Sequence, residues 1–295
     1  MEAEALVAGY GGIYIDKIPV RILSKHYLVK PLHVYVGGLE NSISIGYTLV
    51  KKPVVLGSVG VVRVIEAGYG ASSELSGSVA IVSPITRHGI LGLDIDGLIS
   101  KYTVVPMESI VKTISSLDPL YSISYHLAVA SKVAEEVKGA NLLIIGGGLE
   151  SIALAILSRE HVSRLAVYTH SKNSARILRR HGVEAYGKIQ DIKCCFDTVF
   201  YGSMTPIYLY HILEHLGSND LVIHLNPFIR YVHISIRSPR RVEFVKPVPE
   251  ERHYKCIEGL RKIIERYVRR IHVRSLSEVL GLLPVNSTGV IVSLT

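Results

Sequence analysis

The sequence contains only three cysteines among its 295 residues, Cys194, Cys195 and Cys256. That number excludes a disulfide framework, and a zinc site made of four cysteines is arithmetically impossible. Cys194 and Cys195 are adjacent, so their side chains diverge and cannot form the redox pair of a Cys-x-x-Cys motif. Low cysteine usage is typical of reducing compartments, so we expect a cytoplasmic protein.

Long apolar runs are also missing, although 48% of the residues are hydrophobic and the mean hydropathy is +0.32. No stretch reaches the roughly 18 uninterrupted apolar residues that a membrane-spanning helix requires. The first residues, MEAEALVAGYGG, carry two acids and no basic region, so no secretory signal is expected. The sequence therefore predicts no contact with a membrane.

Tryptophan is absent and phenylalanine occurs four times, which leaves few stacking platforms for single-stranded nucleic acid. The net charge is nevertheless +8, and a basic protein attracts anions. Lys and Arg gather in residues 159–181 and 252–274. Solvated helix faces are the ordinary interpretation of such clusters, and nucleic-acid binding is kept as a third interpretation of the protein.

What is present divides the chain into two parts. Short apolar runs between turns predict a small all-β barrel or sandwich before residue 115, with strands in 13–23, 26–37, 55–68 and 77–85. After Asp118, strands and helices alternate, which predicts a parallel, doubly wound α/β sheet. We expect helices over 124–139, 149–157, 171–182 and 207–217, and strands over 141–145, 164–170, 197–202 and 221–225. Beyond residue 240 we expect an extended segment over 242–248, helices over 251–270 and 275–283, and a final strand over 287–294.

A glycine-rich turn is the strongest functional signal. Gly146-Gly147-Gly148-Leu149-Glu150-Ser151 lies between an apolar strand and an amphipathic helix, the context in which a G-x-G-x-x-G pattern binds a dinucleotide. Ser151 replaces the third glycine, and the carboxylate of Glu150 would repel a diphosphate if it faced one. We predict phosphate binding by Gly146, Gly147, Gly148 and Leu149; the alternative is a turn that merely joins the strand to the helix.

The residues after the next strand indicate which nucleotide binds. An acid about 20 residues after the glycines would hold the ribose hydroxyls of NAD, but Thr169 and His170 stand there. Ser171, Lys172 and Arg176 follow, and a hydroxyl with two cations suits the 2′-phosphate of NADP(H). The alternative is that Lys172 and Arg176 are ordinary surface cations.

A further pair of cofactor candidates ends the strand predicted over 197–202. Ligands of a doubly wound sheet bind beyond the carboxyl ends of its strands. Gly202 and Ser203 are therefore expected to line the same nucleotide site.

The order of motifs resembles the medium-chain dehydrogenase/reductase superfamily, the alcohol dehydrogenase-like proteins. The resemblance is carried by VKPLHVYVGGLE (29–40), KPVVLGSVGVVRVIEAG (52–68), DGLISKYTVVP (96–106), NLLIIGGGLESIALAIL (141–157) and the segment 256–295. It implies a GroES-like β-barrel domain formed by residues 1–117 and 246–295. It also implies a Rossmann nucleotide-binding domain over residues 118–245.

The metal-binding residues of that family do not carry over. Its zinc cysteine falls at Gly37, its proton-relay hydroxyl at Leu39, and its metal-binding His-Glu pair at Ser58 and Val59, while Glu40 retains the acidic position. The segment 85–97 is too short for the structural zinc lobe and has no cysteine. One i, i+4 histidine pair, His211 and His215, is present and is expected to lie on a helix surface. The sequence therefore predicts no zinc.

Zinc-free branches of the superfamily, such as quinone and enoyl reductases, reduce polarised double bonds with NADPH. Tyr47 follows a glycine as in those relatives, and its phenol could donate a proton to a carbonyl; the alternative is a surface or packing tyrosine. Asp118, at the domain junction, is the second catalytic candidate, with an N-cap as its alternative role.

The leading prediction is a zinc-independent NADP(H)-dependent oxidoreductase acting on a small carbonyl or activated alkene. The alternative is a catalytically degenerate dinucleotide-binding protein with a sensor, scaffold or subunit role. The alternating segment 231–238 also predicts a homodimer formed by edge pairing of the nucleotide-binding sheet.

Overall fold

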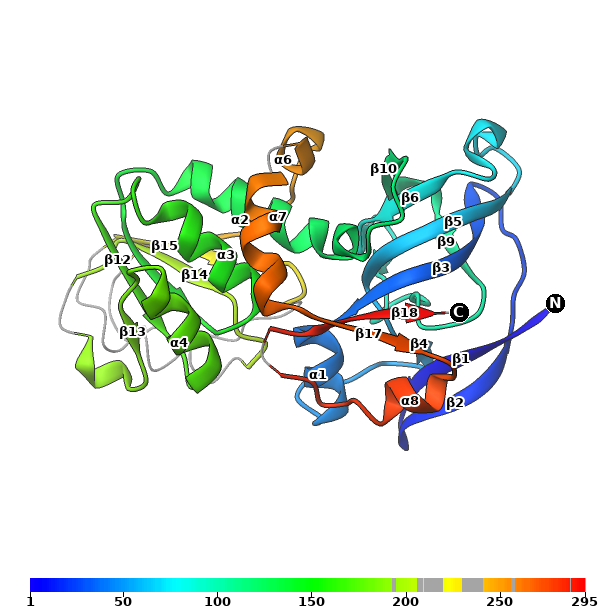
Figure 1. The fold of residues 1–295 in the computed structure, drawn as a ribbon, viewed down its shortest axis with the longest axis horizontal. Coiled ribbons are helices and arrows are strands. Elements are labelled where there is room, and N and C mark those ends of the chain that lie inside the picture. The colour runs from blue at the N-terminus through cyan, green and yellow to red at the C-terminus, as the bar shows by residue number, and fades with distance from the viewer. Residues whose placement is uncertain are drawn as a thin grey trace. The chain divides into compact units, whose positions relative to one another are not determined.

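The computed structural model describes residues 1–192, 195–205, 209, 220–229, 241–255, 258–286 and 288–294. It forms two compact units (Figure 1). The β unit comprises Met1–Tyr125 and Val268–Thr295, and the α/β unit comprises His126–Tyr267. Across the described residues, no helix combines the length and the apolar character needed to cross a membrane.

The β unit is built mainly from antiparallel strands. They are β1 (Glu2–Gly9), β2 (Gly12–Pro19), β3 (His26–Val36), β4 (Val54–Val55), β5 (Val59–Ala67), β6 (Val79–Val82), β7 (Ile85–Thr86), β8 (Gly89–Ile90), β9 (Thr103–Pro106), β10 (Ile110–Ile114), β17 (Arg269–Val273) and β18 (Val290–Leu294). Its helices are α1 (Gly38–Ser44), α8 (Leu276–Leu280) and the 3₁₀ turns η1 (Ser73–Leu75), η2 (Met107–Ser109) and η3 (Pro119–Ile123).

The largest sheet of the β unit joins the two ends of the chain. Its strand order is β10-β6-β5-β3-β18-β17, with β9 also on β3, and a second sheet has the order β2-β1-β4. The four strands expected near the N-terminus correspond to β2, β3, β5 and β6, whereas β1 was not expected. The C-terminal strand β18 pairs with β3 through Val292 and Val34, so the end of the chain lies in the β unit.

The α/β unit contains one parallel sheet. Its strands are β11 (Asn141–Ile145), β12 (Arg164–Tyr168), β13 (Ala185–Tyr186), β14 (Thr198–Tyr201), β15 (Asp220–Leu225) and β16 (Arg241–Val245). Its helices are α2 (Ser124–Glu136), α3 (Leu149–Ser158), α4 (Lys172–Arg180), α6 (Glu251–Lys255), α7 (Glu258–Ile264) and the 3₁₀ turns η4 (Ile189–Asp191) and η5 (Glu265–Tyr267).

The strand order of that sheet is β13-β12-β11-β14-β15-β16, and every pair is parallel. The chain begins at the central strand β11, works outward to β13 and returns to β14, so the order reverses between β11 and β14. This is the Rossmann order, and sheets of this order bind their ligands at the reversal point. The expected doubly wound fold is thus confirmed.

The boundary between the units differs from the expected one. Residues 246–267 belong to the α/β unit, not to the barrel domain that the resemblance implied. The buried ring of His253 in α6 places Nε2 3.3 Å from Oε2 of Glu135 in α2, and α7 contacts α3. These contacts hold α6 and α7 to the α/β unit.

The long helix expected over 251–270 is also corrected. The described residues of that range form α6, α7 and η5, and Arg269 and Arg270 begin the strand β17, so the helical region ends before the expected residue 270. Parallel pairing of β17 with β18 overrides the helical spacing of the sequence, as tertiary contacts often do.

Several predictions lie outside the described residues. They concern Cys194, Cys256, the histidine pair His211 and His215, the helix over 207–217 apart from Leu209, and the edge segment 231–238.

Candidate functional site

The glycine turn follows β11 at the point where the strand order of the α/β unit reverses. Gly146 has a φ of +123°, a left-handed conformation that favours glycine. Its amide donates to the carbonyl of Tyr168 at 2.9 Å, and the amide of Gly202 donates to the carbonyl of Ile145 at 2.8 Å. The turn is therefore tied to the ends of β12 and β14, on either side of β11.

Gly147 lies directly against two hydroxyl groups. A Cβ at this position would collide with Oγ1 of Thr169 and lie 2.9 Å from Oγ of Ser174. Oγ of Ser174 also donates to the carbonyl of Gly147 at 2.7 Å. The backbone of the turn is thus held by the residues that follow β12, and Gly148 forms the N-cap of α3.

Ser151 and the end of β14 close the other side of the turn. Oγ of Ser151 is buried and has no hydrogen-bond partner among the described residues. It occupies the space that a Cβ at Gly202 would need. A Cβ at Gly146 would lie 3.1 Å from the amide nitrogen of Ser203. The structure therefore brings Gly202 and Ser203 to the turn, and Ser151 fits where the pattern has a glycine.

The residues after β12 form the start of α4. Ser171 is its N-cap and accepts from the amide of Ser174 at 3.1 Å, while the amide of Ser171 donates to Oγ1 of Thr169 at 3.2 Å. Nε2 of His170 lies 2.8 Å from the hydroxyl of Tyr168. Thr169 and Ser171 are therefore brought to the glycine turn, while the His170 ring is held by the tyrosine at the end of β12.

The two cations of this segment differ in their surroundings. Lys172 is exposed at the first position of α4. Nη2 of Arg176 donates to Oδ1 of Asn173 at 2.7 Å. Both side chains are accessible to an anion.

Glu150 lies in the first turn of α3 but is only 7% exposed. Its Oε1 is 2.7 Å from Nδ1 of His126 in α2. The pKa of Glu150 is below its usual value, because the raising effect of burial is outweighed by the charge and hydrogen bond of His126, with a smaller hydrogen bond from Asn226. The ring of His126 also packs near Phe228, 6.0 Å between centroids. The carboxylate is therefore held by an internal partner.

Sequence reasoning did not identify His126 or Asn226 as site residues. Asn226 directly follows β15, and its Nδ2 donates to the carbonyl of Gly202 at 3.4 Å. The available signal was positional, since polar residues after parallel strands gather at one edge of a sheet. His126 carried no such signal, because it lies within the helix α2 and does not follow a strand.

The two catalytic candidates lie in the β unit. Tyr47 is 60% exposed, in the loop after α1. Oδ1 of Asp118 accepts from the amide of Leu120 at 3.0 Å, which makes Asp118 the N-cap of η3. The capping role named as its alternative is therefore present.

The positions of the family's catalytic metal ligands hold a different arrangement. A Cβ at Gly37 would collide with the buried ring of Tyr35. The buried Glu40 accepts from the amide of Gly37 at 2.9 Å, and from the amide and hydroxyl of Ser58 at 3.2 Å each. In the part of the chain that the structure describes, no three metal-ligating side chains form a cluster.

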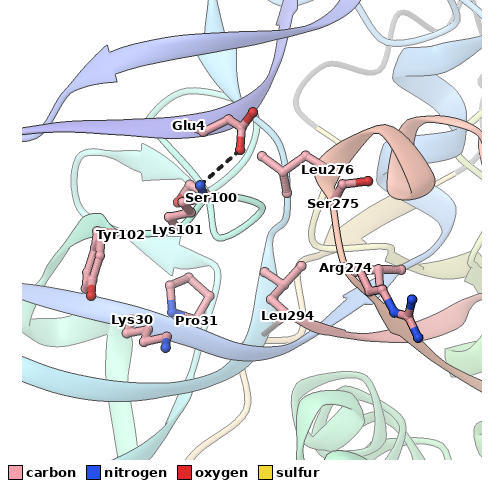
Figure 2. A pocket seen from close by; sticks show the side chains of 11 residues that line it. Glu4, Lys30, Pro31, Ser100, Lys101, Tyr102, Arg274, Ser275, Leu276 and Leu294 are labelled. Carbon is pink, nitrogen blue, oxygen red and sulfur yellow. Dashed lines mark ion pairs between the residues drawn. The ribbon is translucent and has the colours of Figure 1, made fainter.

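A pocket of about 210 Å³ lies in the β unit (Figure 2). The residues described above do not line it. Lys30, Pro31, Tyr102 and Leu294 contribute to its wall. Lys101 is paired with Glu4 at 3.4 Å, the dashed line in Figure 2. None of the site residues predicted from the sequence lines it.

Comparison with known proteins identifies the fold. No protein-family model and no curated protein matches the chain. A protein assigned as a zinc-binding dehydrogenase from Sinorhizobium meliloti 1021, bound to NADP, is 18% identical, with 99% of both chains covered and a TM-score of 0.74. A short chain alcohol dehydrogenase from Escherichia coli CFT073 in complex with NADH is 16% identical, with 99% of both chains covered and a TM-score of 0.75.

A third similar structure is acetophenone reductase from Geotrichum candidum NBRC 4597 in complex with NAD. It is 13% identical, with 99% of this chain and 97% of that chain covered and a TM-score of 0.73. The likeness extends over nearly the whole length of each structure. The chain therefore has the two-domain fold of the medium-chain, alcohol dehydrogenase-like enzymes, a GroES-like barrel with a Rossmann domain, as the sequence resemblance implied.

Proposed function

We propose that the protein is a zinc-independent oxidoreductase of the medium-chain dehydrogenase/reductase superfamily that uses NADP(H) and acts on a small carbonyl or activated alkene. The observation that carries this proposal is the glycine turn at the reversal point of the Rossmann sheet. Structures of the same fold that contain NADP, NADH or NAD support a nicotinamide nucleotide as the ligand.

The residues present fit such a nucleotide. The diphosphate would lie against the backbone of Gly147 and Gly148 and the N-terminus of α3, where unpaired amides and the helix dipole favour an anion. The missing Cβ at Gly147 leaves room for the hydroxyls of Thr169 and Ser174, and Ser174 holds the backbone of the turn through the carbonyl of Gly147. His126 holds the carboxylate of Glu150, so the diphosphate does not meet an unpaired negative charge.

The preference for NADP(H) rests on the residues after β12. Thr169 stands where an acid would select NAD, and in this proposal the exposed Lys172 pairs with the 2′-phosphate. When bound, the nicotinamide supplies or accepts the hydride, and the protein supplies binding and orientation.

The proposal of zinc independence rests on the surroundings of Gly37. The ring of Tyr35 fills the space of a side chain at that position. The carboxylate of Glu40 accepts hydrogen bonds from the amides of Gly37 and Ser58. A catalytic zinc needs three protein ligands, and these residues offer one carboxylate.

A second candidate function is nucleotide binding without catalysis. It is favoured by the exposure of Tyr47, whose hydroxyl makes no hydrogen bond to any described residue, and by the capping role of Asp118. In the enzyme proposal, the phenol of Tyr47 donates a proton to the substrate oxygen. The two functions differ in turnover and share nucleotide binding.

The experiment is a thermal shift titration with NADPH and NADH, followed by NADPH oxidation assays on a quinone, an enone and an aldehyde. A ligand that binds only the folded state raises the melting temperature. A larger shift with NADPH together with oxidation supports the enzyme. A shift without oxidation of NADPH favours the non-catalytic protein, and no shift with either nucleotide excludes both functions.

A further inference from the structure

A cationic pocket of about 530 Å³ lies in the α/β unit, between α4 and η5. Its polar lining consists of Asn173, Arg176, Arg180, His181, Arg266 and Tyr267. Among its described lining residues there is no carboxylate. None of the glycines of the nucleotide turn, Thr169, Ser171 or Lys172 lines it, and Arg176 is the one predicted nucleotide-site residue that does.

The pocket brings together the two basic segments of the sequence. Arg176 and Arg180 are one helical turn apart on α4 and share a face. Arg266 comes from η5, within the second basic segment. Neither Arg180 nor Arg266 forms an ion pair with any described residue. Three guanidinium groups therefore line one cavity without a carboxylate to balance them.

The walls of the pocket are held in place by contacts across it. Nε2 of His181 lies 2.9 Å from the hydroxyl of Tyr267, and the two rings meet edge to face. Oδ1 of Asn173 holds the guanidinium of Arg176 at 2.7 Å. The contact between His181 and Tyr267 holds η5 against the end of α4, and Arg176, Arg180 and Arg266 reach the pocket with exposed side chains.

The electrostatics of the pocket favour an anion. Burial, and to a smaller extent the positive charges of Arg159 and Arg266, lowers the pKa of His181. Arg159 is itself paired with Glu160 at 2.6 Å, outside the pocket lining. Guanidinium groups bind phosphate oxygens through two parallel hydrogen bonds.

We propose that the pocket between α4 and η5 binds a small molecule with adjacent phosphate groups, at a site separate from the nucleotide turn. The positive charge of two or three arginines matches the negative charge of a diphosphate or triphosphate. A single phosphate would leave part of the positive charge unbalanced. The ring of Tyr267 offers a surface for an attached base, so the ligand is either a nucleoside polyphosphate or inorganic polyphosphate. This site does not depend on the proposed oxidoreductase function.

The test is calorimetric titration of the full chain with tripolyphosphate, with ATP and with a single-stranded RNA that has no terminal phosphate, in physiological salt. The test variant is Arg180→Glu with Arg266→Glu, which leaves Arg176 and the other predicted 2′-phosphate residues unchanged. The matched control is Lys138→Glu with Lys188→Glu, two exposed lysines of the same unit outside the pocket. Both pairs change the net charge equally.

We expect tripolyphosphate or ATP to bind, with affinity at least tenfold weaker in the arginine variant and unchanged in the lysine variant. Tighter binding of ATP identifies a nucleoside polyphosphate, and equal or weaker binding identifies the inorganic chain. No binding, an equal loss in both variants, or tighter binding of RNA than of both small ligands overturns the proposal. Circular dichroism melting and an Arg180→Gln/Arg266→Gln variant establish that a loss of binding is not a loss of folding.

Discussion

Gly147 has no side chain, and the packing of the proposed nucleotide turn depends on that absence. Gly147→Ala places a methyl group against the hydroxyls of Thr169 and Ser174, and relief of that crowding costs about 1–3 kcal/mol. We expect the variant to melt at a lower temperature and to lose most of the NADPH-induced rise. Thermal shift titration measures both effects.

The matched control is Gly259→Ala in α7, where a Cβ would meet nothing within 4 Å. Alanine is favoured over glycine in a helix by roughly 1 kcal/mol, so this variant should be slightly more stable and bind NADPH normally. A Gly147→Ala protein that keeps both its stability and its NADPH response would contradict the role assigned to the turn.

Glu150 gives a prediction about pH. The folded state lowers the pKa of Glu150, because the pair with His126 outweighs the opposite effect of burial. The folded protein therefore binds fewer protons than the unfolded one at this group, so its contribution to stability is present above about pH 4.3 and is lost as the pH falls through the folded pKa. Glu150→Gln should remove this dependence.

At neutral pH the same variant leaves His126 without its buried partner, a change that costs about 3–5 kcal/mol. Chemical denaturation at pH 7 and at several acidic pH values measures both expectations. Glu160→Gln is the control, since Glu160 pairs with Arg159 at the surface and solvent screens such a pair. Equal losses in the two variants would show that burial of Glu150 has no special effect.

Much of the nucleotide turn could be predicted at this scale, because glycine spacing after an apolar strand is a local pattern. The orientation of Glu150 could not, because it depends on His126 from a helix 24 residues earlier. The same reason applies to Gly37, where sequence reasoning found a missing ligand but not the ring of Tyr35 that fills its place. Contacts between elements decide such details.

At the scale of elements, the start of α4 gives a test of cofactor choice. Lys172→Glu places a negative charge where the 2′-phosphate is predicted, so the affinity for NADPH should fall at least tenfold, equivalent to about 1.4 kcal/mol. The affinity for NADH, which has no such phosphate, should change much less. Fluorescence titration with each nucleotide measures the difference.

Lys188→Glu, an exposed lysine beyond β13, controls for the general effect of charge and should leave both affinities near their original values. If Lys172→Glu weakens NADPH and NADH equally, the assignment of this segment to the 2′-phosphate is wrong.

The elements themselves were predicted with uneven success, for a physical reason. Strands and helices of the Rossmann sheet have clear apolar periods, and β11, β12, β14 and β15 lie close to their expected ranges. Arg269 and Arg270 follow the helical period of the preceding residues, yet they pair with Val290 and Ile291 in β17. A distant strand determined their conformation, and no local pattern contains that information.

At the scale of the whole molecule, a homodimer remains a prediction from the sequence segment 231–238. Pairing of two such edges would join two nucleotide-binding sheets across a two-fold axis. Light scattering of the purified protein should give twice the chain mass of 32.5 kDa. A monomer at all accessible concentrations would exclude this assembly.

The chain returns to its first unit through β17 and β18, so the β unit depends on residues from both ends of the sequence. Ile291 is fully buried in β18 and pairs with Tyr35 of β3. Ile291→Ala should lower the free energy of unfolding by about 2–5 kcal/mol, because it leaves a cavity in a sheet made of non-local strands. Arg269→Ala, at an exposed position of β17, is the control and should change stability little. Chemical denaturation of both variants measures the difference, and similar stabilities would show that the returning strand is not part of the core of the β unit.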